Sequence, residues 1–191
     1  MARIAKKIFF LRHSDKDGNR ITKTGFKNFF DANGNPQQLL SVLPDDVTDA
    51  WTGTSFFRTQ ESLIGYMTAN QWTPEHLHEA VVNMGSEEQV KQLIESSFEE
   101  LAKEHGPVKA FKLALGDNYD RFLDNMVGAL NCMFDEMVGG IGIMFGHSPL
   151  IDVLAQCFGA TVEDGGLAPR TGFCFELNDD GTICAAPLLL D

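Results

Sequence analysis

The sequence has few basic residues and lacks any long hydrophobic run. Fifteen lysine and arginine residues stand against 27 aspartate and glutamate residues, so the formal net charge is -12. Broad contact with nucleic acid or an anionic membrane requires a basic surface, and this charge argues against both partners. No stretch approaches the roughly 18 apolar residues of a membrane span, and the four at 8–11 are too few for a signal-peptide core. We therefore expect a cytoplasmic protein with neither partner.

Cysteines are also scarce, and their spacing is that of neither a CxxC pair nor a metal site. The four are Cys132, Cys157, Cys174 and Cys184. Buried, reduced thiols are the simplest interpretation and suit a reducing compartment. A calcium loop is excluded at 15–19, because Arg20 stands where the loop needs glycine and Phe26 where it needs its final glutamate. The sequence therefore predicts no metal and no other cofactor.

The composition is that of an ordinary globular domain. The chain has 191 residues, of which 43% are hydrophobic and 22% charged, so it is long enough to bury a core and too apolar to be disordered. No repeat, low-complexity tract or linker divides it. We expect one domain over residues 1–191, with a helical insertion around 74–137. The sequence indicates no oligomeric state.

Hydrophobic patterning predicts strands that alternate with helices. The continuous apolar runs at 8–11 and 141–145 are typical of strands covered on both faces. Further strands are expected at 50–53, 81–82, 170–177 and 183–190, and helices from Thr22 or Thr24 to Gly34, from Ser55 through Met67, and over 90–101, 119–137 and 149–158. Such alternation predicts an α/β layered domain with a mostly parallel sheet.

Both buried-strand runs end in a histidine. His13 follows the first run and His147 the second, and ligands in such sheets bind beyond the carboxyl ends of the strands. A lone histidine there is more often structural, but Arg12 beside His13 supplies a planar guanidinium suited to phosphate oxygens. Arg58 enters the first turn of a helix, whose N-terminus favours an anion. The alternative for Arg58 is an ion pair with Glu61.

In this order and spacing, the residues resemble the histidine phosphatase superfamily, which has the phosphoglycerate mutase-like fold. The matching segments are Leu11-Arg12-His13, Ile21-Thr22-Lys23-Thr24-Gly25, Thr54 through Arg58, and Gly146-His147-Ser148. The resemblance covers nearly the whole chain. It implies a three-layer α/β/α sandwich with a mostly parallel sheet.

The resemblance also implies a metal-independent phosphatase that hydrolyses a phosphate monoester. Neutral His13 would attack phosphorus and form a phosphohistidine, which water then hydrolyses. Arg12, Arg58 and His147 would hold the phosphoryl oxygens, and Ser148 is expected to add a phosphate contact. The far ring nitrogen of His13 is expected to donate to a backbone carbonyl.

The leaving oxygen needs a proton, and the resemblance assigns its donor to Glu79. In the superfamily a glutamate in a Leu-x-Glu context follows the second arginine by some twenty residues, and Leu77-His78-Glu79 fits at 21 positions after Arg58. Glu75 lies close, and residues 80–83 lack the family's usual glycines and aromatic. The alternative for Glu79 is a solvated surface glutamate without a catalytic role.

Three alternatives stay open at this point. One is a phosphoglycerate mutase-type phosphoryl transferase, and another is a catalytically impaired protein that binds phosphate or a phosphopeptide. A zinc site on His13 and His147 is disfavoured, because the adjacent arginines repel a cation. We expect a phosphorylated small molecule as substrate, with a phosphoprotein as the alternative, and Lys16 is placed to reach a distal charge on it.

Overall fold

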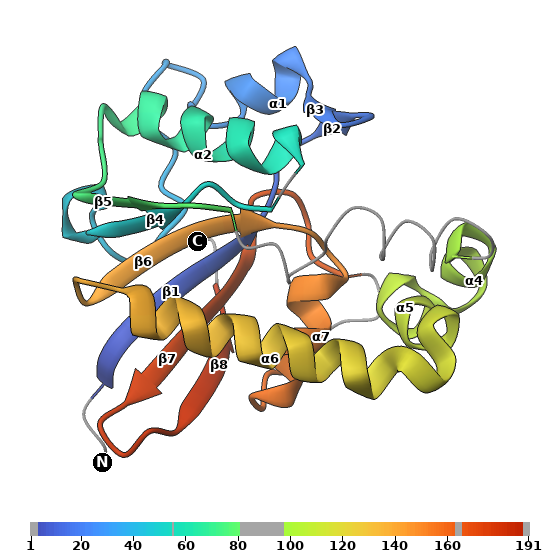
Figure 1. The fold of residues 1–191 in the computed structure, drawn as a ribbon. Coiled ribbons are helices and arrows are strands. Elements are labelled where there is room, and N and C mark those ends of the chain that lie inside the picture. The colour runs from blue at the N-terminus through green and yellow to red at the C-terminus, as the bar shows by residue number, and fades with distance from the viewer. Residues whose placement is uncertain (1–3, 55, 81–97, 163–165, 189–191) are drawn as a thin grey trace.

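The computed structural model describes residues 4–54, 56–80, 98–162 and 166–188, and strands alternate with helices along it (Figure 1). The strands are β1 (Ile4–Arg12), β2 (Lys16–Asp17), β3 (Arg20–Ile21), β4 (Asp49–Trp51), β5 (His76–His78), β6 (Ile141–Gly146), β7 (Gly172–Asn178) and β8 (Ile183–Pro187). The α-helices are α1 (Lys23–Lys27), α2 (Phe57–Asn70), α4 (Phe98–His105), α5 (Pro107–Leu115), α6 (Tyr119–Glu136) and α7 (Leu150–Cys157). Two 3-10 turns are η1 (Pro44–Asp46) and η2 (Gly116–Asn118).

Six strands form one sheet in the order β5-β4-β6-β1-β7-β8. β5, β4, β6 and β1 run parallel, β7 is antiparallel to β1, and β8 is antiparallel to β7. The mostly parallel sheet predicted from the sequence is therefore confirmed, with β7 as its reversed strand. β2 and β3 form a separate two-stranded hairpin.

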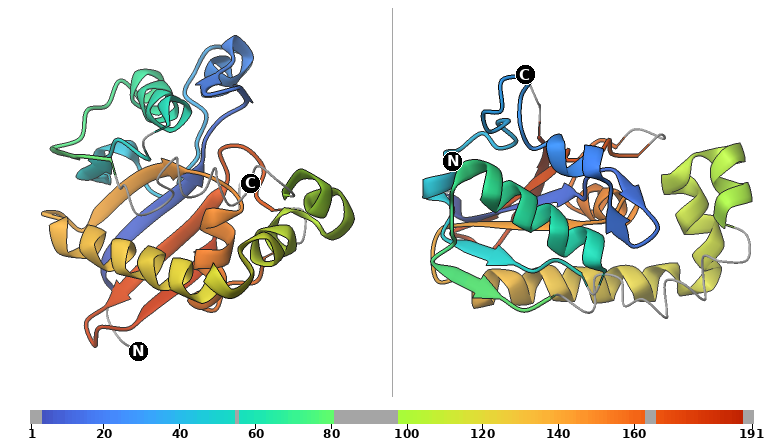
Figure 2. Two further views of the ribbon diagram at one scale, coloured as in Figure 1. Left: turned by 45° about the vertical axis from the view of Figure 1, so that its right-hand side comes forward. Right: turned by 90° about the horizontal axis from the view of Figure 1, so that it is seen from above.

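Helices cover both faces of this sheet, and each face has its own hydrophobic core. Along β1, Ile8 and Phe10 belong to the core beneath α5, α6 and α7, whereas Phe9 and Leu11 belong to the core beneath α2. This alternation follows from the two-residue period of a strand. α2 lies on one side of the sheet, with α6 and α7 on the other (Figures 1 and 2). The three-layer α/β/α arrangement is confirmed.

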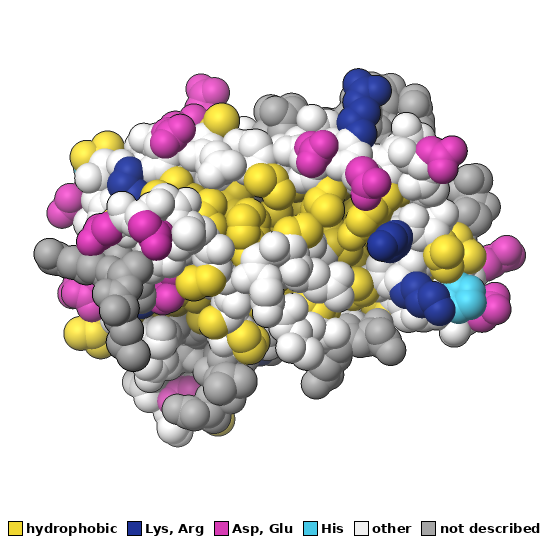
Figure 3. Space-filling view, turned by 90° about the horizontal axis from the view of Figure 1, so that it is seen from below, with side chains coloured by type: hydrophobic (Ala, Val, Ile, Leu, Met, Phe, Trp, Pro, Cys, Tyr) yellow, Lys and Arg dark blue, Asp and Glu magenta, His cyan; other side chains and the backbone are white. Residues whose placement is uncertain are grey.

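The face with α6 and α7 shows many hydrophobic side chains. Figure 3 shows them gathered across its middle, with acidic side chains towards the rim. Partly buried members that pack against the core beneath include Phe122, Val127, Phe158 and Ile183. No described helix is long and apolar enough to cross a membrane.

Several local expectations differ from the structure. β5 and α5 were not expected, and the strand expected at 81–82 and most of the helix expected over 90–101 lie outside the described residues. α1 ends at Lys27 rather than near Gly34, because the Asp31 carboxylate accepts from the backbone N–H groups of Asn33 and Asn35 and holds a turn there. Thr22 does cap α1, accepting from Gly25 N.

The prediction of buried cysteines is wrong for three of the four. Cys174 is buried on β7, whereas Cys132, Cys157 and Cys184 are exposed, and all four are free thiols. Cys132 lies on the exposed side of α6 and Cys184 on the outermost strand, β8.

Two glycine substitutions should change stability in opposite directions. A Cβ at Gly142, in β6, would approach the buried Trp51 ring to 2.6 Å, so Gly142→Ala should destabilise the fold by about 1–3 kcal/mol. Gly128 lies exposed in α6 with nothing within 4 Å of the added Cβ, so Gly128→Ala should stabilise by up to about 1 kcal/mol. Urea unfolding monitored by circular dichroism measures both changes in stability. Unfolding midpoints equal to that of the wild type in both variants would contradict this packing.

Candidate active site

Parallel pairing of β1 with β6 brings the two strand-end histidines together. Arg12 pairs with Gly146, and His13 N donates to Gly146 O at 2.9 Å. The rings of His13 and His147 lie 5.2 Å apart between centroids, at an interplanar angle of 64°. Both are buried, with 4% and 7% of their surface exposed. Each histidine follows the end of a buried strand, as the sequence predicts, and the structure adds that the two strands are neighbours.

One ring nitrogen of His13 is committed to the backbone. Nδ1 lies 2.7 Å from Ser14 O, and because a carbonyl only accepts, Nδ1 must carry the proton. Nε2 is then left with its lone pair. Ser14 is itself held in place, since its Oγ donates to Gly25 O at 2.7 Å and its N donates to Ser62 Oγ at 3.0 Å. The expected backbone contact of His13 is confirmed.

Both histidines are kept neutral by their surroundings. Burial, together with the charges of Arg58, Arg12 and Lys16, lowers the pKa of His13 to about 4 against the opposing contact with Ser14 O. Burial and the same three cations hold the pKa of His147 well below its ordinary value. A neutral imidazole at neutral pH has a free lone pair and is a competent nucleophile.

His147 is held by Thr54 and Phe56, two residues of the segment that leads into Arg58. Thr54 Oγ1 lies 2.9 Å from His147 Nε2, and the Phe56 ring meets the imidazole edge-on at 4.7 Å between centroids. The loop that carries them approaches the sheet closely at Gly53, which has φ +86° and whose added Cβ would come within 2.8 Å of Phe145 O. These contacts connect the start of α2 with the end of β6.

Arg58 lies in the first turn of α2, as expected. Its guanidinium sits 4.3 Å from the centroid of the Phe56 ring, and Nη1 donates to Gly18 O at 3.3 Å. Glu61, considered from sequence as its ion-pair partner, instead binds Arg20 and accepts from Ile21 N at 2.8 Å. Arg58 therefore lies between the β2–β3 hairpin and Phe56.

Arg12 and Lys16 bring further positive charge to the two histidines. Arg12 Nη1 donates to Leu167 O, while its Nε is buried and has no hydrogen-bond partner within the described residues. Burial and repulsion from Arg58 and Arg12 lower the pKa of Lys16, which reaches the site from the hairpin. Within the described ranges, Lys16 has no carboxylate at ion-pair distance.

Ser148 and Asp152 lie near Arg12 and near Leu167, whose carbonyl binds Arg12. Ser148 Oγ accepts from Leu167 N at 3.3 Å, so the hydroxyl contacts the segment that binds Arg12. Asp152 is fully buried in α7, and burial raises its pKa against the opposing effects of Ser148, Leu167 and Arg12. The sequence analysis missed Asp152, although an acid in the apolar run 149–158 was the available signal.

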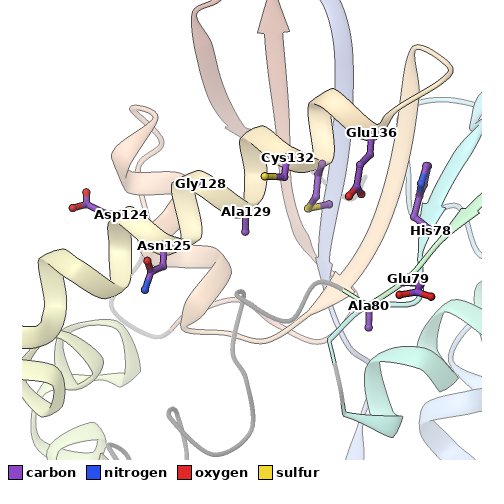
Figure 4. Close-up of a pocket in the computed structure, with 10 residues that line it drawn as sticks. His78, Glu79, Ala80, Asp124, Asn125, Gly128, Ala129, Cys132 and Glu136 are labelled. Carbon is purple, nitrogen blue, oxygen red and sulfur yellow. The ribbon is translucent and has the colours of Figure 1, made fainter.

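Glu79 lies at the same edge of the sheet but outside this cluster. It follows β5, is exposed, and has no hydrogen bond or ion pair within the described part of the chain to either histidine. It lines a cavity of about 640 Å³, with the α6 residues Asp124, Gly128 and Glu136 on the opposite wall (Figure 4). Glu75, the neighbouring acid, is exposed ahead of β5.

The described residues include no group of three or more histidine, cysteine, aspartate or glutamate side chains that could hold a metal ion. The candidate site therefore consists of two neutral histidines and three cations. Such an arrangement can bind the oxygens of an anion and present a nucleophilic nitrogen to its central atom.

The fold is shared with solved structures of low sequence identity. No family model and no curated protein matches the sequence. The crystal structure of phosphoglycerate mutase from Bacillus anthracis str. Sterne is 15% identical and superposes with a TM-score of 0.59, covering 95% of this chain and 91% of that chain. A protein assigned as an alpha-ribazole-5'-P phosphatase from Escherichia coli str. K-12 substr. MG1655 is 11% identical, with a TM-score of 0.52 and coverage of 98% and 96%. The phosphoglycerate mutase-like fold expected from the sequence is confirmed.

The burial of neutral His13 predicts a loss of stability in acid. Its pKa is 6.5 ordinarily and about 4 in the fold, so between these values the unfolded chain binds a proton that the folded chain does not. The free energy of unfolding should therefore fall as pH drops from 6.5 to 4. In His13→Asn this fall should be smaller by on the order of 1–3 kcal/mol. Urea titrations of both proteins across this range measure the difference, and parallel profiles would refute the assignment.

Proposed function

We propose that this protein is a metal-independent phosphatase that hydrolyses a phosphate monoester through a phosphohistidine on His13. The observation that carries the proposal is a buried, neutral His13 with an unprotonated Nε2 beside Arg12, Arg58 and His147. The fold, shared with a phosphoglycerate mutase and an alpha-ribazole-5'-P phosphatase, supports phosphoryl transfer at this place.

The reaction has two displacements at phosphorus. In the first, His13 Nε2 attacks phosphorus, the ester P–O bond breaks, and the leaving oxygen takes a proton from Glu79. In the second, water attacks the phosphohistidine, the P–N bond breaks, and the water proton passes to the Glu79 carboxylate. Splitting a difficult displacement into two is the benefit of covalent catalysis.

The cations of the site stabilise the charge on the transferred group. Arg12 and Arg58 offer planar donors to the phosphoryl oxygens, and these donors are set in place before the reaction by Leu167 O and Gly18 O. Neutral His147 donates a hydrogen bond to a phosphoryl oxygen, and Ser148 adds a contact. Lys16 supplies a third positive charge from the hairpin.

The cavity beside Glu79 suits the alcohol part of a phosphorylated small molecule. Its volume of about 640 Å³ falls in the range of small-molecule sites. A phosphoprotein is the alternative substrate. With a net charge of -12, the protein binds its phosphate locally rather than through a basic surface.

Two other functions have support. The fold shared with a phosphoglycerate mutase favours a phosphoryl transferase, which would move phosphate between positions of one molecule with little release. The separation of Glu79 from the histidines favours a binding protein with impaired turnover. Tight phosphate binding without release from any phosphometabolite would establish that second function.

Replacement of the nucleophile tests the proposal directly. His13→Ala should lower kcat for p-nitrophenyl phosphate by more than about 10³-fold, because the proposed nucleophile is lost. Acid-quenched wild-type protein incubated with labelled substrate should carry phosphate on a histidine, and His13→Ala should carry none. Equal rates of phosphate release by the two proteins would reject the mechanism.

Replacement of Arg58 tests whether this arginine binds the phosphoryl oxygens. Arg58→Ala should lower kcat/KM by on the order of 10²–10³-fold, because a preset donor to the phosphoryl oxygens is lost. Arg121→Ala, which removes an exposed arginine of α6, serves as the matched control and should retain wild-type rates. Equal rates in Arg58→Ala and the control would remove Arg58 from the site.

A further inference from the structure

A hydrogen bond between a histidine and a buried carboxylate joins β4 to β5 immediately before Glu79. His78 Nε2 lies 2.8 Å from Asp49 Oδ1, and the Asp49 side chain is fully buried. The His78 ring also stacks on Trp51, with centroids 4.9 Å apart and an interplanar angle of 20°. The side chain of His78 is thus held both at its edge and across its face.

Asp49 has a full set of further donors. Its Oδ1 also accepts from Val138 N at 3.1 Å, and its Oδ2 accepts from Gly139 N at 2.8 Å and from Thr48 Oγ1 at 2.8 Å. A buried carboxylate with this many donors stays in one orientation. Trp51 is fixed as well, because its Nε1 donates to Glu136 Oε2 at 3.2 Å. The two groups that hold His78 are therefore themselves immobilised.

These contacts matter because, among the described strands, β5 pairs with β4 alone. β5 spans three residues at the edge of the described sheet, and its outer side pairs with no described strand. Besides the side-chain contacts, His78 O accepts from Thr52 N at 3.3 Å, so the peptide that leads into Glu79 is tied to β4. His76, two positions earlier in the same strand, has no side-chain hydrogen bond or ring contact within the described residues.

We propose that His78, held by Asp49 and Trp51, is a positioning residue that sets the backbone of Glu79 for proton transfer to the leaving oxygen. The inference rests on the proposed function, in which Glu79 is the general acid. His78 and Glu79 line the same cavity, where the alcohol part of the substrate would lie (Figure 4). A proton donor displaced by about 1 Å loses much of its effect on rate.

Leaving-group chemistry separates this role from a purely structural one. An alkyl phosphate expels a strongly basic alkoxide and needs the proton, whereas p-nitrophenyl phosphate expels a stable phenolate and needs it little. The experiment measures kcat and KM of the full-length protein on p-nitrophenyl phosphate and on propyl phosphate. The variants are Glu79→Gln, His78→Leu, His78→Gln and, as the matched control, His76→Leu.

The expected results differ by substrate. Glu79→Gln should lose on the order of 10²–10⁴-fold in kcat on propyl phosphate and much less on p-nitrophenyl phosphate. His78→Leu should show the same substrate dependence at about tenfold or more, with KM unchanged. His78→Gln, whose amide can donate to Asp49, should recover part of the loss, and His76→Leu should match the wild type on both substrates.

Each other outcome has a definite meaning. Equal losses of His78→Leu on both substrates, or wild-type rates on both, overturn the positioning role. A Glu79→Gln variant without substrate dependence removes Glu79 as the acid and the inference with it, while His13-dependent turnover would still uphold the phosphatase. If His78→Leu does not fold, His78→Phe carries the same test, because it keeps an aromatic ring on Trp51 but cannot donate to Asp49.

Discussion

The parallel pairing of β1 with β6 is the constraint on which the site depends. It sets Arg12 opposite Gly146 and so places His13 and His147 in contact, although 133 residues separate them in sequence. The pairing is secured away from the site, by apolar side chains that alternate between two cores on the faces of the sheet. A shift of one residue would turn every one of these side chains to the opposite face. The packing of the cores therefore determines the position of the histidines.

The charges at the site follow from burial and proximity together. In a protein with a net charge of -12, three cations gather around two buried imidazoles, and each effect opposes protonation of the rings. A neutral ring is less costly to bury than a charged one, and it is also the form that can attack phosphorus. The positive potential that attracts an anion thus keeps the proposed nucleophile in its reactive state. A phosphate bound among these cations, as proposed, would offset the cost of confining like charges.

Parts of the fold and site follow from local sequence, and other parts do not. The runs at 8–11 and 141–145 predict buried strands because strands covered on both faces are continuously apolar, and Arg12, His13 and His147 are found from their ends. β5 gives no such signal, since its leucine, Leu77, is 57% exposed while the flanking histidines are half-buried. Its strand conformation comes from pairing with β4, which no local pattern contains.

The contacts behind the site are equally invisible to local sequence. Thr54 and Phe56 were noted only as neighbours of Arg58, and their contacts with His147 come from the approach of the loop at Gly53 to the end of β6. A phosphate contact of Ser148 could be expected from its motif. The orientation of its hydroxyl, however, depends on a hydrogen bond from Leu167 N, 19 residues further along the chain. Such contacts join elements far apart in sequence.

The proposed site has a half that would bind phosphate and a half that would meet the leaving group, and different contacts hold the two halves in place. The phosphate half is built on β1 and β6, which lie inside the sheet, and its arginines are tied to backbone carbonyls. The half that would meet the leaving group is built on β5, a three-residue edge strand held by its pairing with β4, by one buried carboxylate and by one stacked ring. Binding of phosphate can therefore persist when the edge strand moves, whereas protonation of the leaving oxygen cannot. Under the proposed mechanism, turnover therefore depends on the short edge strand β5, whereas phosphate binding depends on β1 and β6.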